Sequence, residues 1–159
     1  MADLDLPPCG LYKTTLPHPE KPEQVGSGRL VYFHNHSNQG VGMVLLPKAN
    51  DQNKWAFHER GFSVSDAAWC HTLQPVAPEG LYIATAPLEA SDDRVIAEGQ
   101  LVQLGYNANA EGILFFPRKA ESANALLIPD KGLKVSNALV NKLAPVRLVG
   151  PKKPSTKVN

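Results

Sequence analysis

Apolar and polar residues alternate in short runs along this chain, and proline, glycine or a polar turn ends each run. Residues 11–15 and 81–85 are rich in strand-forming side chains, and a proline follows each of them two positions later. Longer runs at 30–36 and 101–107 are joined through the polar segments 37–40 and 108–111 to the apolar runs 43–46 and 113–116. The pattern therefore predicts two first strands and two hairpins.

The remaining pattern continues in the same order in both parts of the chain. Pro47 and Pro117 lack a main-chain donor and are expected to close the third strands. Fourth strands are expected at 55–58 and 126–128, each followed by a glycine turn at Gly61 or Gly132. Ser65 and Ser136 are typical helix caps, so one helical turn is predicted at 66–69 and another at 137–140. The closing Pro-Val of each part is expected to start a fifth strand.

The two parts are copies of one pattern. Residues 10–76 and 80–146 both open with Gly-Leu-Tyr and close on Leu-x-Pro-Val. Matching landmarks recur in order between those ends: Thr15 and Thr85, Pro17 and Pro87, Gly28 and Gly99, Asn38 and Asn109, Gly42 and Gly112, Pro47 and Pro117, Gly61 and Gly132, Ser65 and Ser136, Ala67 and Ala138. This order predicts an internal tandem repeat of about 70 residues per copy.

The layout of each copy resembles the Src-homology-type small barrel, with five short strands, a long first loop, a central hairpin and a helical turn before the last strand. The resemblance covers layout alone, because the aromatic platform of that family's first loop is absent here. It implies a mainly β fold of two small-barrel-like units. One larger barrel shared by both copies and two half-barrels packed about a pseudo-twofold axis are alternatives. The short join, residues 77–79, predicts that the copies pack as one compact body.

Composition narrows the class of protein. The chain has 159 residues, 43% of them hydrophobic, and a formal net charge of +1, which suits a folded globular protein. The N-terminal extension, residues 1–9, carries acids where a signal peptide carries bases, and no run is long enough to span a membrane. Cys9 and Cys70 are too few for a disulfide framework. We expect a cytoplasmic protein without a membrane partner.

The charge is unevenly distributed. No acidic residue follows Asp130, and the tail at 150–159 contains Lys152, Lys153 and Lys157. Such a segment could follow the phosphates of a nucleic acid. It has neither aromatic residues nor apolar periodicity, so a solvated, flexible tail is the alternative interpretation.

The copies differ most in their chemically active side chains. Every histidine, both cysteines and both tryptophans lie in the first copy or just before it. His34, Asn35 and His36 stand opposite Gly105, Tyr106 and Asn107 in the second copy. Because a duplicated scaffold retains what the fold needs, residues found in one copy are better candidates for function. The candidate binding residues are His34, Asn35, His36, Trp69 and His71.

A metal site is one chemical hypothesis for these residues. His34 and His36 are two apart on an expected strand, so their imidazoles would share a face and could bind one ion. Cys70 could add a third ligand if the helical turn folds over that face, and this ligand set suits zinc. Exposed strand histidines without a metal are the simpler interpretation.

Three function classes follow from these features. We expect a non-catalytic module that binds a protein or peptide, with its site in the first copy or in the groove between copies, and with no cofactor. A zinc-dependent hydrolase using the His34 and His36 pair is the first alternative. A nucleic-acid adaptor acting through the basic tail is the second.

Overall fold

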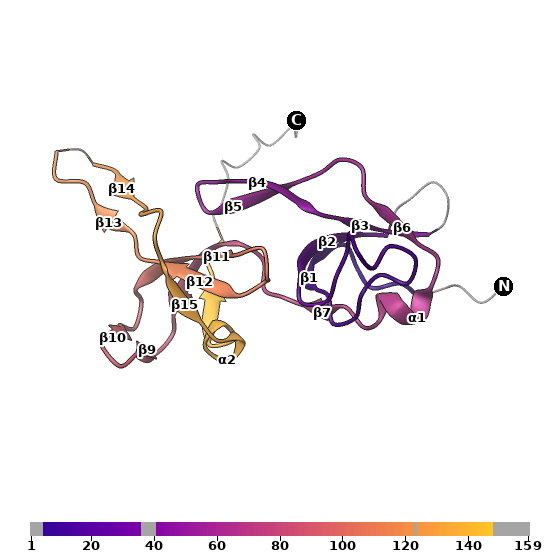
Figure 1. Cartoon of the computed structure of the whole chain (residues 1–159). Helices are drawn as coiled ribbons and strands as arrows, with labels where there is room; N and C mark the ends of the chain where they lie inside the picture. The colour runs from indigo at the N-terminus through magenta and orange to yellow at the C-terminus, as the bar shows by residue number, and fades with distance from the viewer. Residues whose placement is uncertain (1–4, 36–40, 123, 148–159) are drawn as a thin grey trace, which may run out of the picture.

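The computed structural model describes residues 5–35, 41–122 and 124–147. The protein is mainly β: 43% of the described residues lie in strands and 6% in helices, and the sheets are antiparallel (Figure 1). No helix in these ranges is long and apolar enough to cross a bilayer.

The N-terminal half contains a five-stranded sheet in the order β6-β3-β2-β1-β7. Its strands in chain order are β1 (Gly10–Lys13), β2 (Leu30–His34), β3 (Gly42–Leu45), β6 (Phe62–Val64) and β7 (Gln74–Pro75). The short helix α1 (Ala67–Cys70) precedes the last strand.

The C-terminal half contains a second five-stranded sheet in the order β15-β12-β11-β8-β16. Its strands in chain order are β8 (Gly80–Ala84), β11 (Leu101–Tyr106), β12 (Gly112–Phe115), β15 (Leu133–Val135) and β16 (Leu143–Pro145). Helix α2 (Asn137–Val140) again precedes the last strand. Counted along the chain, the five strands of one sheet therefore occupy the same positions as the five strands of the other.

Three two-stranded hairpins complete the fold. The first arm is β4 (Pro47–Asp51) with β5 (Lys54–Phe57), and the second arm is β13 (Arg118–Lys119) with β14 (Leu126–Leu127). A third hairpin, β9 (Leu88–Ser91) with β10 (Arg94–Ile96), lies in the first connection of the C-terminal half. In Figure 1 the first arm extends from the N-terminal sheet over the C-terminal half, whereas the second arm projects away from both sheets.

Each sheet covers its own core. Val31, Phe33 and Val44 are fully buried in the first core, beside Trp69 and Cys70 of α1. The second core is centred on Val102, Leu104 and Leu114, and Leu30 of β2 is also buried in it. Leu11, Trp55 and Phe57 of the N-terminal half pack against the same cluster. The two halves therefore share apolar contacts as well as a short join.

Several sequence expectations were wrong in detail. The third strands β3 and β12 end before Pro47 and Pro117, as expected, but Pro47 also begins β4, a strand that pairs with β5. Strands β6 and β15 were missed, and β7 and β16 begin before the expected Pro-Val. The long first loop expected in the C-terminal half contains β9 and β10.

The helical turns follow the expectation closely, with one correction. Ser136 caps α2 and accepts a hydrogen bond from Leu139 N at 3.3 Å. In α1 the cap is Asp66 and not Ser65, because the Asp66 carboxylate accepts from Trp69 N at 3.3 Å.

Candidate functional site: the groove between the two arms

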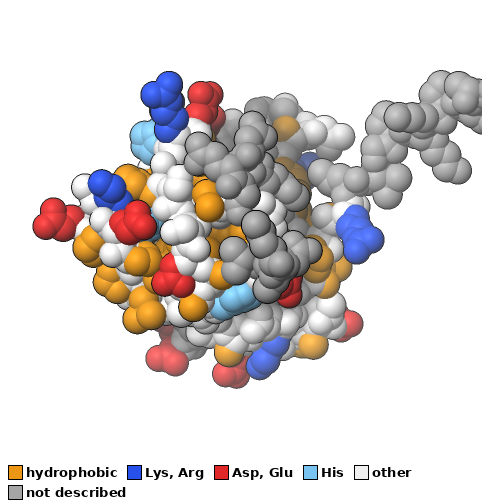
Figure 2. Space-filling model, turned by 90° about the vertical axis from the view of Figure 1, so that its right-hand side faces the viewer, with side chains coloured by type: hydrophobic (Ala, Val, Ile, Leu, Met, Phe, Trp, Pro, Cys, Tyr) orange, Lys and Arg blue, Asp and Glu red, His pale blue; other side chains and the backbone are white. Residues whose placement is uncertain are grey.

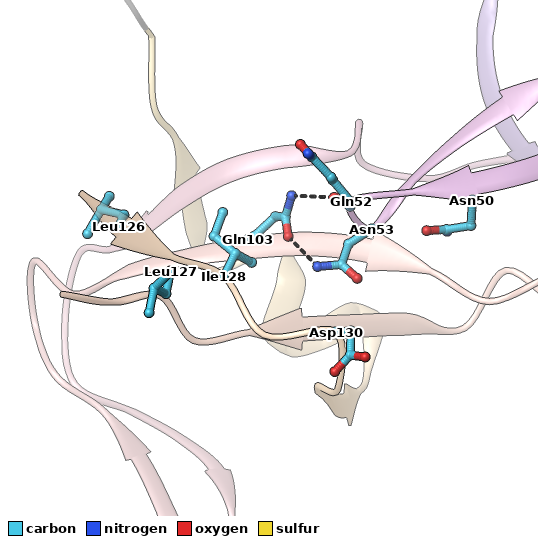
Figure 3. A pocket seen from close by; sticks show the side chains of 8 residues that line it. All are labelled: Asn50, Gln52, Asn53, Gln103, Leu126, Leu127, Ile128 and Asp130. Carbon is cyan, nitrogen blue, oxygen red and sulfur yellow. Dashed lines mark hydrogen bonds between the residues drawn. The ribbon is translucent and has the colours of Figure 1, made fainter. Parts of the chain in front are cut away.

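The tip of the first arm is a two-residue turn that rests on β11. Gln52 and Asn53 have φ angles of 51° and 66°, so both central residues are left-handed, as in a type I′ turn. Asn53 Nδ2 donates to Gln103 Oε1 at 2.9 Å, and Gln103 Nε2 donates to the carbonyl oxygen of Gln52 at 3.1 Å (Figure 3). The tip is thereby held by a reciprocal pair of amide hydrogen bonds.

Trp55 fixes the arm further along β5. Its indole Nε1 donates to the carbonyl oxygen of Tyr106 at 2.7 Å, and its main-chain N–H donates to Glu79 Oε2 at 3.1 Å. The Tyr106 hydroxyl in turn donates to the carbonyl oxygen of Ala77 at 2.6 Å. Burial raises the pKa of the Glu79 carboxyl above its ordinary value, and burial also raises the pKa of Tyr106.

Gly105 makes the close approach of the arm feasible. A Cβ at this position would lie 2.8 Å from the carbonyl oxygen of Asn53, which is too short for any side chain. The corresponding position in β2 is His34, because His34 pairs with Met43 in the same register in which Gly105 pairs with Ile113. The C-terminal sheet therefore has room for an arm at a place where the N-terminal sheet has an imidazole.

The second arm leaves apolar side chains uncovered. Leu126, Leu127 and Ile128 are 58%, 48% and 40% exposed, and they follow one another along the chain. They form one wall of a groove of about 600 Å³, whose other wall is the tip of the first arm. Figure 3 shows these side chains on one side of Gln103 and the first arm on the other.

The groove combines aliphatic groups with amide side chains and one carboxylate. Its polar lining consists of the amide side chains of Asn50, Gln52, Asn53 and Gln103, together with the carboxylate of Asp130. Asn53 Nδ2 also donates to the carbonyl oxygen of Pro129 at 3.1 Å, which ties the first arm to the segment that follows β14. A carboxamide both donates and accepts, so this lining can satisfy either group of a peptide bond.

Of the residues singled out from the sequence, His34 and Asn35 lie together beside the N-terminal segment. Asn35 Nδ2 donates to the carbonyl oxygen of Pro7 at 2.8 Å, and the Cys9 thiol donates to Asn35 Oδ1 at 3.0 Å. His34 Nδ1 lies 3.7 Å from Cys9 Sγ. These contacts fasten residues 7–9 to the end of β2. His36 lies outside the described residues.

The other candidates lie apart from this pair. Trp69 is buried, and its indole donates to the carbonyl oxygens of Pro17 at 2.8 Å and Leu16 at 3.2 Å, so it packs the first core. Cys70 is fully buried, and burial raises the pKa of its thiol to about 11. His71 is exposed at the end of α1.

The structure does not bring His34 and Cys70 to one point. Cys70 Sγ lies on the Phe33 side of the first sheet, and successive strand residues point to opposite faces, so His34 faces the other way. Across the described ranges no group of three or more His, Cys, Asp or Glu side chains could hold a metal ion.

The buried histidine has a structural role that the sequence did not indicate. His18 is 2% exposed, its Nδ1 accepts from the main-chain N–H groups of Glu20 and Lys21 at 3.0 Å, and its Nε2 lies 3.0 Å from the carbonyl oxygen of Ser63. This pattern requires the neutral ring with the proton on Nε2, which donates to Ser63. The ring also packs against Trp69, with centroids 5.4 Å apart.

Among the described residues, the visible face of the N-terminal half shows no concentration of one charge sign. Figure 2 looks onto this half, and the basic and acidic side chains on the visible face are scattered among apolar ones.

The sequence allowed a groove between the two halves but did not indicate which residues line it. Leu126, Leu127 and Ile128 are typical of a buried strand, and only the position of the hairpin leaves them exposed. One signal was available at the tip of the first arm, where Gln52 and Asn53 suit a tight turn. No protein-family model matches the chain, and neither a curated protein nor a solved structure is significantly similar to it.

Proposed function

We propose that the protein is a non-catalytic interaction module whose ligand is an extended segment of another polypeptide, held in the groove between the two arms. The observation that carries the proposal is the row of exposed aliphatic side chains, Leu126, Leu127 and Ile128, facing the amide groups of the first arm. Exposed apolar patches bordered by polar groups are typical of protein interaction sites.

The chemistry of the groove favours an extended peptide. The second arm has only two short strands, so β14 can offer main-chain groups to an added strand. Amide side chains on the opposite wall can hydrogen-bond the other edge of that strand, and the aliphatic wall can take its apolar side chains. Binding of this kind combines main-chain hydrogen bonds with side-chain pockets.

Continuity with an existing interface supports the same assignment. Asn53 and Gln103, which hold the first arm on β11, also line the groove. The groove therefore extends an interface that already joins one β element to another through amide hydrogen bonds. A bound strand would enlarge this contact and would not need to create a new one.

We further propose that the module arose by tandem duplication of a unit with a Src-homology-like layout. The two strand orders correspond, and Tyr12 and Tyr82 make the same hydrogen bond, from the hydroxyl to the carbonyl oxygens of Pro8 at 2.7 Å and Pro78 at 2.6 Å. Gly28 and Gly99 have similar φ angles of 73° and 79° at corresponding turns. These likenesses support a common origin for the two halves.

The alternatives have less support in the described residues. The groove lining contains Asp130 and neither lysine nor arginine, which is unsuited to a phosphate backbone. Lys152, Lys153 and Lys157 lie outside the described residues. Within the described residues, no group of three or more His, Cys, Asp or Glu side chains could bind the zinc ion that such a hydrolase needs.

A displayed library of random linear peptides tests the proposal. Peptides are selected on the whole wild-type chain and then compared on Leu127→Ser and on Leu16→Ser. Leu16 is 51% exposed in the N-terminal half, so its substitution controls for loss of an exposed leucine elsewhere. We expect enriched peptides to lose binding on Leu127→Ser and retain it on Leu16→Ser. Equal binding to both variants would contradict the groove as the site.

A further inference from the structure

A second cavity lies between the β9–β10 hairpin and the start of β15. Its volume is about 370 Å³, and its lining includes Ser91, Asp93, Arg94, Phe116 and Lys131. None of its lining residues belongs to the groove between the arms. Its chemistry is also different, because two bases and a hydroxyl group replace the neutral amides.

Arg94 is an exposed side chain that lies against an aromatic ring. The guanidinium carbon lies 3.8 Å from the centroid of the Phe116 ring, so the two planar groups are in contact. The pairing of β9 and β10 shifts register between Arg94 and Val95, and such an irregularity redirects a side chain. A guanidinium fixed in this way keeps its N–H donors available for a two-point contact with an oxyanion.

Lys131 is placed by its neighbour. A Cβ on Gly132 would lie 2.5 Å from the carbonyl oxygen of Leu114, so the chain at 131–133 packs directly against β12. This close packing fixes the main chain beside Lys131, an exposed residue that lines the same cavity as Arg94. Neither Arg94 nor Lys131 forms an ion pair within the described part of the chain, although Asp93 borders the cavity.

The N-terminal half differs at the corresponding positions. Val25 precedes Gly28 by the same spacing by which Ile96 precedes Gly99, and both side chains are fully buried. Aligning these two pairs places Glu23 at the position that corresponds to Arg94. Leu46 stands opposite Phe116, and Arg60 stands opposite Lys131. An acid, a leucine and a base in the N-terminal half therefore correspond to two bases and an aromatic ring in the C-terminal half.

We propose that this cavity is an oxyanion-binding site, in which Arg94 and Lys131 bind a carboxylate or phosphate group and Ser91 donates a further hydrogen bond. The stacked guanidinium supplies the geometry, and the unpaired lysine supplies the second charge. The site goes beyond the peptide groove and does not depend on it. Its ligand is a free phosphate or the acidic side chain of a polypeptide.

Titrations of the whole chain, followed by amide shifts at low ionic strength, test this site and separate the two sources. The probes are inorganic phosphate, a blocked Gly-Glu-Gly peptide and its Gly-Gln-Gly counterpart. We expect saturable shifts for residues 91–94 and 131–133. Saturation by phosphate alone assigns a free anion, whereas saturation by the glutamate peptide and not by the glutamine peptide assigns an acidic side chain.

Three variants distinguish a specific binding site from non-specific electrostatic attraction. Arg94→Gln is expected to weaken binding about tenfold, and Phe116→Leu, which leaves the charge unchanged, should weaken it by a smaller factor. Arg118→Gln removes an exposed arginine outside the cavity and should leave binding unchanged. Equal losses in Arg94→Gln and Arg118→Gln, or no saturation by any probe, would overturn the proposal.

Discussion

The indole Nε1 of Trp55 and the carbonyl oxygen of Tyr106 are joined by a hydrogen bond of 2.7 Å that links the first arm to the C-terminal half. Trp55 also packs against the second core, although it belongs to a hairpin of the N-terminal half. One wall of the groove is therefore held in place by a side chain from the same arm that forms it.

Trp55→Phe should loosen this wall. The substitution keeps an aromatic ring but removes the donor to Tyr106, which should lower the free energy of unfolding by about 1–2 kcal/mol. Urea denaturation measures this change, and amide exchange of the first arm should become faster. Trp69→Phe is the matched control, because its indole bonds lie within the N-terminal half. Faster arm exchange in Trp69→Phe alone would contradict the role given to Trp55.

Gln52→Gly should stabilise the protein. Gln52 has a φ of 51°, a region that is unfavourable for a side chain by roughly 1 kcal/mol and open to glycine. The main-chain carbonyl that accepts from Gln103 is retained, so the unfolding free energy should rise by about that amount. Thermal unfolding tests this expectation. A loss of stability would show that the Gln52 side chain stabilises the fold by more than its left-handed backbone conformation destabilises it.

Removal of the Glu79 carboxylate should change the pH dependence of stability. Burial raises the pKa of Glu79 in the folded state, so folding favours the protonated form. The protonated Glu79 side chain contributes most to the free energy of unfolding below the ordinary glutamate pKa. This contribution is lost as the pH rises through the raised pKa of the folded state. Compared with Glu79→Gln, the wild type should therefore gain stability as the pH is lowered through that window. Denaturant titrations of both proteins from neutral to acidic pH measure the difference, and a constant difference would contradict it.

The two cysteines should differ in reactivity. Burial raises the pKa of Cys70 to about 11, so almost no thiolate forms at neutral pH and reagents cannot reach it. Cys9 is partly exposed and should react first. A chromogenic disulfide reagent should therefore titrate one thiol in the native protein and the second only after unfolding. Loss of the native reaction in Cys9→Ser would identify the first thiol, and its persistence would contradict this assignment.

His18→Leu should destabilise the N-terminal half. Leu88 occupies the corresponding buried position in the C-terminal half, so an apolar side chain suits the site in shape. The variant nevertheless leaves the N–H groups of Glu20 and Lys21 without their acceptor, at a cost of about 2 kcal/mol. Chemical denaturation measures this loss. An unchanged unfolding free energy would show that water replaces the ring nitrogen.

Local sequence patterns predicted much of the fold, because alternation and turn residues act within a few positions. The strands of the central hairpins and the helical turn capped by Ser136 were predicted from such signals. Strands β6 and β15 have only three residues each, too few for a readable period, and their pairing with β3 and β12 depends on the rest of the sheet.

The candidate site was less predictable, because exposure depends on where an element lies in the fold. The sequence pattern predicts a strand at both Leu127 and Phe57. Phe57 packs against the second core, whereas Leu127 is 48% exposed. Sequence also pointed to Trp69 as a binding residue, whereas its ring fills the first core. A residue type found in one half of the chain alone can therefore serve packing in that half and need not mark a binding site.

The most direct test of the account is the dissociation constant of one library-selected peptide for three proteins: the wild type, Leu127→Ser and Leu16→Ser. Loss of one buried leucine contact predicts about tenfold weaker binding to Leu127→Ser, and Leu16→Ser should bind like the wild type. Equal constants for all three proteins would place the interaction outside the groove and contradict the proposed peptide site.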